Sequence, residues 1–404
     1  MTVPLPPAPP VRGGVLNPAL LFPAIWLGVV LTSAFSGIPF YPYSNGLLFY
    51  LAGAVLTFCA CSLMTQTAVM KTLPRRSSSL TLSWLPIGPR HASSVYLVCM
   101  SVSILFQIVD RWLFVGSDWW TPTGLNIYRT TLTDHEEASH FPAIALLNFF
   151  FFSAIPFVIT NRHVLSQNAK LAILTLLACY IYLSTARASL FAASLIGLFF
   201  YCHYRFRPVL LLLAAGGLYS LFEILGGLVG KASDGEIGSF WLYTLAPSHA
   251  LDQIVEGYRA DWSNTLYSFR PLHRVLSSLG LIYPQPHLWP YYETPYPTNV
   301  TTLFGPYVLD YGIAGSLVWT GLFGAFSGFL HGLTRRFPQN SGAAFAGSLN
   351  LSILTLGIFY DYYTSSTFVW IGFLLTPVFF GSPALQAPLP LSDTGPSIEV
   401  RPVR

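Results

Sequence analysis

Apolar segments of about 20 residues recur along this chain, and they constrain its fold more than any other feature. A helix of about 20 residues crosses the hydrocarbon core of a bilayer, whereas the strands of a membrane barrel would alternate polar and apolar residues. Only 9% of the residues are charged and 53% are hydrophobic, while a soluble domain carries about 25% charged residues. The sequence therefore predicts an all-α integral membrane protein. About ten transmembrane helices are expected, at 15–37, 45–66, 93–114, 141–160, 168–184, 187–205, 207–228, 302–331, 343–360 and 364–382.

The segment 168–205 is too long for one ordinary span and just long enough for two short ones, at a rise of 1.5 Å per residue. The charges of the connecting segments decide between the two, because cytoplasmic loops are enriched in Lys and Arg. With two spans, both termini are cytoplasmic and 13 of the 20 basic residues lie in cytoplasmic segments. With one span, Arg335 and Arg336 would face outward. The sequence therefore predicts two spans joined at Arg187, with this arginine at an outward-facing corner. The thirteen are Arg12, Lys71, Arg75, Arg76, Arg90, Arg162, Lys170, Arg205, Arg207, Arg335, Arg336, Arg401 and Arg404.

This topology divides the chain into five parts. Pro-rich tails at 1–14 and 383–404 are expected to be disordered. Transmembrane helices fill 15–228 and 302–382, and an extracytoplasmic loop occupies 229–301. The loop is too aromatic for a flexible linker. An aromatic belt at the membrane interface explains part of this composition, and the other rings are candidates for a carbohydrate groove, because a flat ring suits a sugar. The candidate sugar-binding residues are Trp262, Tyr267, Trp289 and Tyr292.

A short amphipathic helix is predicted inside the loop, over SFRPLHRVLSSLG (268–280). Pro271 suits the first turn of a helix. Leu272, Val275, Leu276 and Leu279 recur at helical spacing and form one apolar stripe. Arg270, His273 and Arg274 fall on the opposite face with Ser277. A helix of this kind can lie along the outer membrane interface.

Two arginines at the start of a helix suit a phosphate group, because free N–H groups, the helix dipole and guanidinium groups all favour an anion. The competing interpretation is that these arginines contact the headgroups of the outer leaflet. Arg187, Arg259, Arg270 and Arg274 cluster on the outer side against the usual charge bias, which brings the two interpretations level. The sequence contains no His/Cys set with metal-ligand spacing, and no metal or other cofactor is expected.

Three residues of the outer side are candidates for a general base, which needs a carboxylate or an imidazole within reach of a hydroxyl. They are Asp310, Glu293 and His273. Glu223, deep in the seventh predicted helix, is a further functional candidate or the partner of an arginine. Gly324, Gly328 and Gly332 repeat every four residues in the eighth and indicate close helix packing.

Three stretches resemble one family. The run TNVTTLFGPYVLDYGIAG (298–315), with NTLYSFRPLHRVLSSLG (264–280) and the STARASL corner (184–190), is similar to bacterial oligosaccharide repeat-unit polymerases of the O-antigen polymerase (Wzy-type) family. The resemblance is strongest over about 180–320, and the other helices match only in hydropathy. The family's motif of Arg, ten residues and Gly is approximated, because nine residues separate Arg270 from Gly280.

The resemblance implies a metal-independent glycosyltransferase of the bacterial inner membrane, related in fold to the O-antigen ligases within the GT-C group. Such an enzyme works at the periplasmic face. It transfers a growing glycan from undecaprenyl diphosphate onto a new lipid-linked repeat unit for O-antigen, capsule or exopolysaccharide. The lipid bilayer and the pathway's chain-length regulator and flippase are the implied partners, and nucleic acid is not one. On this basis Arg187, Arg270 and Arg274 are expected to bind the diphosphate. A ligase-like glycosyltransferase and a lipid-linked oligosaccharide flippase are the alternatives.

Overall fold

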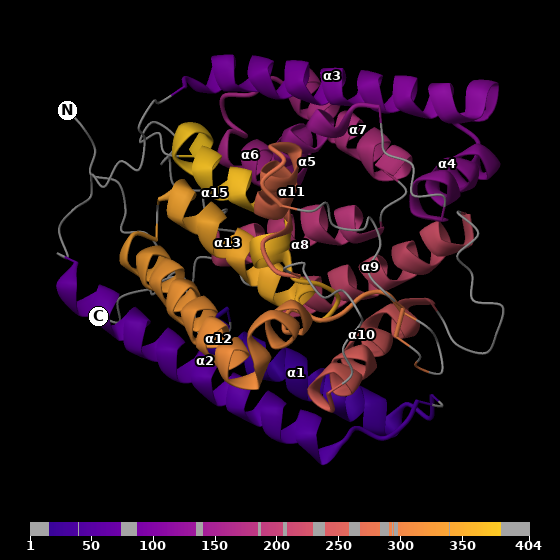
Figure 1. Ribbon diagram of the computed structural model, residues 1–404. Helices are drawn as coiled ribbons and strands as arrows, with labels where there is room; N and C mark the ends of the chain where they lie inside the picture. The colour runs from indigo at the N-terminus through magenta and orange to yellow at the C-terminus, as the bar shows by residue number, and fades with distance from the viewer. Residues whose placement is uncertain are drawn as a thin grey trace, which may run out of the picture.

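The described residues form a bundle of helices, which confirms the all-α part of the predicted fold class (Figure 1). The computed structural model describes residues 16–38, 40–73, 87–134, 140–184, 187–204, 208–228, 239–257, 267–282, 291–292, 294, 298–338 and 340–380. Its helices are α1 (Pro18–Phe35), α2 (Asn45–Thr72), α3 (Pro89–Val115), η1 (Gly116–Asp118), α4 (Pro122–Asp134), η2 (Pro142–Leu147), α5 (Asn148–Phe152), α6 (Ala154–Thr160), α7 (Gln167–Ser184), α8 (Arg187–Tyr204), α9 (Pro208–Leu228), α10 (Ser239–Val255), α11 (Arg270–Ser278), α12 (Gly305–Arg336), α13 (Ser341–Leu356), α14 (Tyr362–Ser365) and α15 (Thr367–Phe380).

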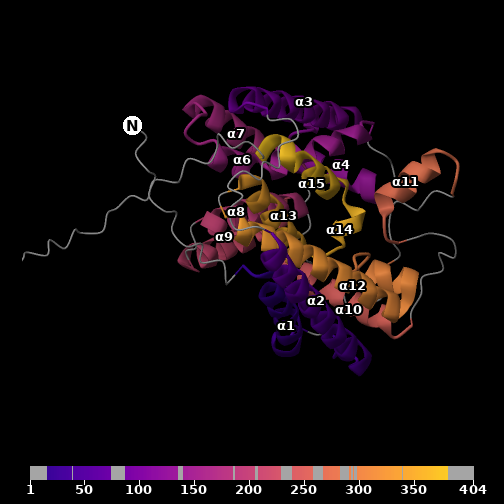
Figure 2. The same cartoon turned by 90° about the vertical axis from the view of Figure 1, so that its left-hand side faces the viewer.

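Both views show the same layering. Helix α3 lies along one side of the bundle and α1 with α2 along the opposite side, with α8, α12, α13 and α15 between them (Figures 1 and 2). Among the described residues, four helical segments are long and apolar enough to cross a membrane: Pro18–Phe35, Asn45–Thr72, Arg90–Asp118 and Gly305–Arg336. Shorter apolar helices lie within α8, α9, α13 and α15. The length and composition of these segments support the predicted membrane protein, and the larger number of ten spans stays a prediction.

The predicted division of 168–205 into two helices is confirmed. Helix α7 ends at Ser184 and α8 begins at Arg187. The single helix expected over 141–160 is wrong, because this segment folds as η2, α5 and α6. Pro156 lacks the N–H group that would bond to the carbonyl of Phe152, where α5 ends. Helix α10 also forms inside the segment expected to be a loop. Near its start, the backbone N–H of Phe240 donates to Glu223 Oε1 at 2.8 Å.

Helices α2 and α12 form the most extensive contact between any two described elements. Gly324 and Gly328 of α12 lie directly against the backbone of Phe58 and Ser62 of α2, and Gly332 lies against Val69. The predicted close packing along this glycine face is therefore confirmed. The helix also bends near its start at Gly312, whose φ of 68° and ψ of −178° favour glycine.

Gly328→Leu is expected to destabilise the fold by about 1–3 kcal/mol, because overpacking forces the backbones apart. A Cβ atom at this position would lie 2.8 Å from the Cα atom of Ser62, and backbone atoms cannot rotate out of the way. Thermal unfolding of the detergent-purified protein measures the effect. Gly216→Leu on α9 is the matched control, since a Cβ there meets nothing within 4 Å. Equal unfolding temperatures for the two variants would contradict the packing described.

Candidate active site

The chain enters α11 through a residue of unusual backbone conformation, Phe269. Its φ of 57° is the only positive value among the described residues that are not glycine. Its N–H group donates to Thr364 Oγ1 of α14 at 3.3 Å, and its ring packs edge-on against Trp319 of α12 at 5.2 Å between centroids. A left-handed conformation costs a side chain about 1 kcal/mol, so these contacts fix the direction in which α11 leaves the bundle. Figure 2 shows α11 at the edge of the molecule, close to α14.

Asp310 of α12 fastens the segment that enters α11. One carboxylate oxygen accepts the N–H group of Tyr267 at 2.8 Å, and the other accepts the N–H group and the hydroxyl of Ser268 at 2.7 Å and 2.5 Å. Three donors therefore surround the carboxylate that the sequence marked as a general base. This arrangement suits a residue that positions α11 better than one that abstracts a proton.

His273 lies on the inner side of α11 and is 4% exposed. Its Nδ1 atom is buried and has no hydrogen-bond partner among the residues that the structure describes. Burial and the positive charge of Arg270 lower the pKa of His273 below its ordinary value, although Asp310 opposes the shift. The imidazole is therefore neutral at pH 7. Of the base candidates that are described, His273 has the more suitable chemistry.

Arg270 and Arg274 stand one helical turn apart on α11, beside the phenol of Tyr360. Arg270 donates from Nη1 to the hydroxyl of Tyr360 at 3.3 Å. Arg274 is exposed, but the surrounding protein and the charge of Arg270 lower the pKa of its guanidinium. Arg274 has no hydrogen-bond partner within the described ranges. Two like charges this close repel each other, and a bound anion would relieve that repulsion.

The remaining predicted residues divide into two groups. Tyr267 and Tyr292 are buried, at 7% and 0% exposure, so neither ring presents a face to a sugar in this structure. Burial and the charge of Asp310 raise the pKa of Tyr267 to about 12, and the backbone of Tyr292 pairs with that of Thr298. Glu293, Trp262, Trp289 and the side chain of Arg187 lie outside the described residues. The structure thus brings together Arg270, His273, Arg274, Asp310 and Tyr267.

Sequence reasoning missed Asp361, which anchors the other side of the site. It is 0% exposed and lies at the start of α14. Its Oδ2 atom accepts the hydroxyls of Tyr307 at 3.0 Å and Thr364 at 2.5 Å. Thr364 in turn accepts the N–H group of Phe269, so Asp361 holds α11 through one intermediate side chain. A lone carboxylate in an apolar region was the available signal.

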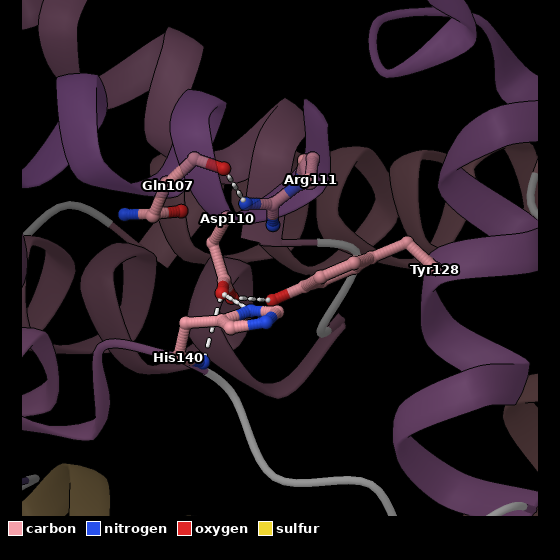
Figure 3. A network of polar contacts seen from close by, with 5 residues as sticks. All are labelled: Gln107, Asp110, Arg111, Tyr128 and His140. Carbon is pink, nitrogen blue, oxygen red and sulfur yellow. Dashed lines mark hydrogen bonds and ion pairs between the residues drawn. The ribbon is translucent and has the colours of Figure 1, made fainter. Parts of the chain in front are cut away.

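A second polar cluster lies at the end of α3, where Asp110 and Arg111 are 2% and 3% exposed (Figure 3). Asp110 accepts the hydroxyl of Tyr128 at 2.5 Å and the N–H group of His140 at 2.9 Å. Arg111 lies 4.5 Å above the ring of Tyr128 and donates to the carbonyl of Leu183. Leu183 belongs to the last turn of α7, whose carbonyl groups have no partner within the helix. Arg111 therefore fixes the end of α7, at the residue before Ser184, where the helix ends.

Arg111→Met is expected to lower the free energy of unfolding by about 1–3 kcal/mol, because it leaves the carbonyl of Leu183 buried without its donor. Thermal unfolding of the purified protein tests this. Arg90→Met removes an exposed arginine from the other end of α3 and serves as the control. An Arg111→Met protein that unfolds at the wild-type temperature would show that the contact contributes nothing.

Within the described ranges, no three His, Cys, Asp or Glu side chains gather as a metal ion would require. Comparison of the chain with protein-family models, with curated proteins and with solved structures found no match. The chemistry of the cluster on α11 is therefore the basis for a functional proposal.

Proposed function

We propose that the protein polymerises undecaprenyl-diphosphate-linked oligosaccharide repeat units at the outer face of the bacterial inner membrane. One observation carries the proposal: one short helix brings two guanidinium groups and a neutral imidazole together, and two carboxylates, Asp310 and Asp361, hold the start of that helix. Diphosphate release needs positive charge, and activation of an acceptor hydroxyl needs a base. The cluster offers both within a single turn.

The proposed reaction is the transfer of a glycan from one lipid carrier to a sugar hydroxyl. His273 takes the proton from the acceptor hydroxyl, whose oxygen forms the new glycosidic bond. The bond between the donor sugar and the diphosphate breaks at the same time, and undecaprenyl diphosphate leaves with the electron pair. Arg270 and Arg274 stabilise the negative charge that develops on this leaving group, as preorganised donors do in other enzymes. Asp310 holds the segment that enters α11 and so keeps both arginines and the imidazole of this helix in position.

The outer face of α11 supports a lipid-linked substrate. Leu272, Val275 and Leu279 are 48%, 56% and 66% exposed, and they are three of the four residues of the predicted apolar stripe. A helix with such a face and a basic opposite face suits the interface of a bilayer. A diphosphate attached to an isoprenoid chain lies at this same level, so the substrate would reach the arginines from the side. We propose the ten-span topology with both termini cytoplasmic on the same grounds of charge and length. In it, η2, α5 and α6 together take the place of the single helix expected over 141–160.

The test uses purified full-length protein in lipid vesicles with an undecaprenyl-diphosphate-linked repeat unit. A ladder of glycans with two or more repeats is the expected product. Movement of unmodified lipid between the leaflets without any ladder would instead identify a flippase. Growth that requires a different acceptor glycolipid would identify a ligase.

A further inference from the structure

A second basic site lies at the opposite end of α12 from Asp310. A cavity of about 40 Å³ opens there between α8, α12, α13 and the start of α1. On the same measure a water molecule needs about 10–15 Å³, so the cavity has room for a group of several heavy atoms. None of the residues considered for the proposed reaction lines it.

Three basic side chains face this cavity: His331 and Arg335 of α12, one turn apart, and His203 of α8. His331 is 9% exposed, and its Nε2 atom is buried without a hydrogen-bond partner among the described residues. His203 is placed by a contact of 3.0 Å between its Nε2 atom and the carbonyl of Pro338. No acidic residue appears among the described residues of the lining. A buried polar nitrogen without a partner is costly, so a group that bonds to His331 Nε2 would bind favourably.

Asn350, which also lines the cavity, favours a ligand that accepts hydrogen bonds. The side-chain oxygen of Asn350 already accepts the hydroxyl of Tyr363 at 2.6 Å and that of Ser327 at 3.2 Å. The amide N–H groups of Asn350 are therefore the part of this side chain that can donate to a ligand in the cavity. Imidazole, guanidinium and amide groups therefore line one small cavity.

We propose that this cavity binds a phosphate-class anion, either free phosphate or the phosphate of a lipid headgroup. Arg335 is exposed at the mouth, where its guanidinium can bind two phosphate oxygens at once. His331 supplies a donor from inside the cavity. The site is independent of the polymerase reaction and would exist whatever that reaction proves to be.

The experiment measures the unfolding temperature of full-length, delipidated protein in dodecyl maltoside. One series adds inorganic phosphate and a second adds phosphatidylglycerol, each against potassium chloride at equal ionic strength. We expect a saturable rise in the unfolding temperature, because a ligand that binds only the folded state stabilises it. His331→Gln and Arg335→Gln should each weaken the apparent affinity about tenfold or more. Lys71→Gln is the matched control, since it removes an exposed cation from the end of α2, where Val69 packs against Gly332 of α12.

Each result either identifies the ligand of the cavity or overturns the proposal. A rise with inorganic phosphate alone identifies free phosphate as the ligand, and a rise with phosphatidylglycerol alone identifies a headgroup. No rise with either probe overturns the proposal. So does a rise that persists unchanged in both His331→Gln and Arg335→Gln, or one that Lys71→Gln weakens equally. Arg335 is exposed, so its variant folds independently of the buried packing and keeps the test decisive.

Discussion

Arg274→Ala is expected to slow polymer growth by about 10²–10³-fold, while the amount of folded protein in the membrane stays unchanged. Arg274 is exposed on α11 and has no hydrogen-bond partner within the described ranges, so its loss removes no fold contact of that kind. Under the proposed function, it removes one of two cations that stabilise the departing diphosphate. The measurement is the rate at which repeat units are added to the ladder, in vesicles that contain equal amounts of wild-type or variant protein.

Two further variants sharpen this prediction. Arg274→Lys keeps the charge but loses the paired donors of the guanidinium, so it should recover only part of the rate. Arg90→Ala removes an exposed arginine that lies on α3, outside the α11 cluster, and should leave the rate unchanged. A full-length ladder formed by Arg274→Ala at the wild-type rate would remove Arg274 from the mechanism.

His273→Gln should reduce the rate by about 10²–10⁴-fold, the usual contribution of a general base. The dependence on pH gives a second readout. A base works in its deprotonated form, and burial with the nearby charge of Arg270 lowers the pKa of His273. The wild-type rate should therefore hold as the pH falls to 6.5, the ordinary pKa of histidine, and decline only at lower pH. The variant's residual rate should lack this decline.

The rates of the wild-type protein and of His273→Gln are measured between pH 5 and 8, because histidine titrates over this range. His91→Gln, an exposed histidine on α3, is the control and should keep both the rate and the acid decline. If His273→Gln retained the wild-type profile, the base would be another residue. Asp310 would then need to leave its three hydrogen bonds to act.

Local pattern predicted those parts of the fold that depend on length and periodicity. The break between α7 and α8 followed from a segment too long for one span, and α11 followed from apolar residues at helical spacing. The fragmented segment 141–160 and helix α10 were not predicted. The first depends on Pro156 within a run that is mostly apolar. Helix α10 lies in a region rich in aromatic residues, and such a composition fits a membrane interface as well as it fits a buried helix.

The candidate site was also predicted only where local pattern determines it. Spacing alone placed Arg270, His273 and Arg274 on one face of a helix. Sequence reasoning could not rank Asp310 against His273 as the base, because the donors that occupy Asp310 come from residues 42 and 43 positions away. The bond between Phe269 and Thr364 spans 95 positions and is equally invisible to local pattern. Such contacts decide whether a carboxylate reacts or only holds a helix in place.

The central proposal is that the protein extends a glycan and releases one lipid diphosphate for each repeat unit added. The most direct test measures both products of one reaction, with purified protein and a single lipid-linked repeat unit as the only substrate. The claim predicts a ladder whose added repeats equal the undecaprenyl diphosphate released, and loss of both products in the double variant Arg270→Gln/Arg274→Gln. Diphosphate release without longer glycans, or a ladder that persists unchanged in the double variant, would contradict it.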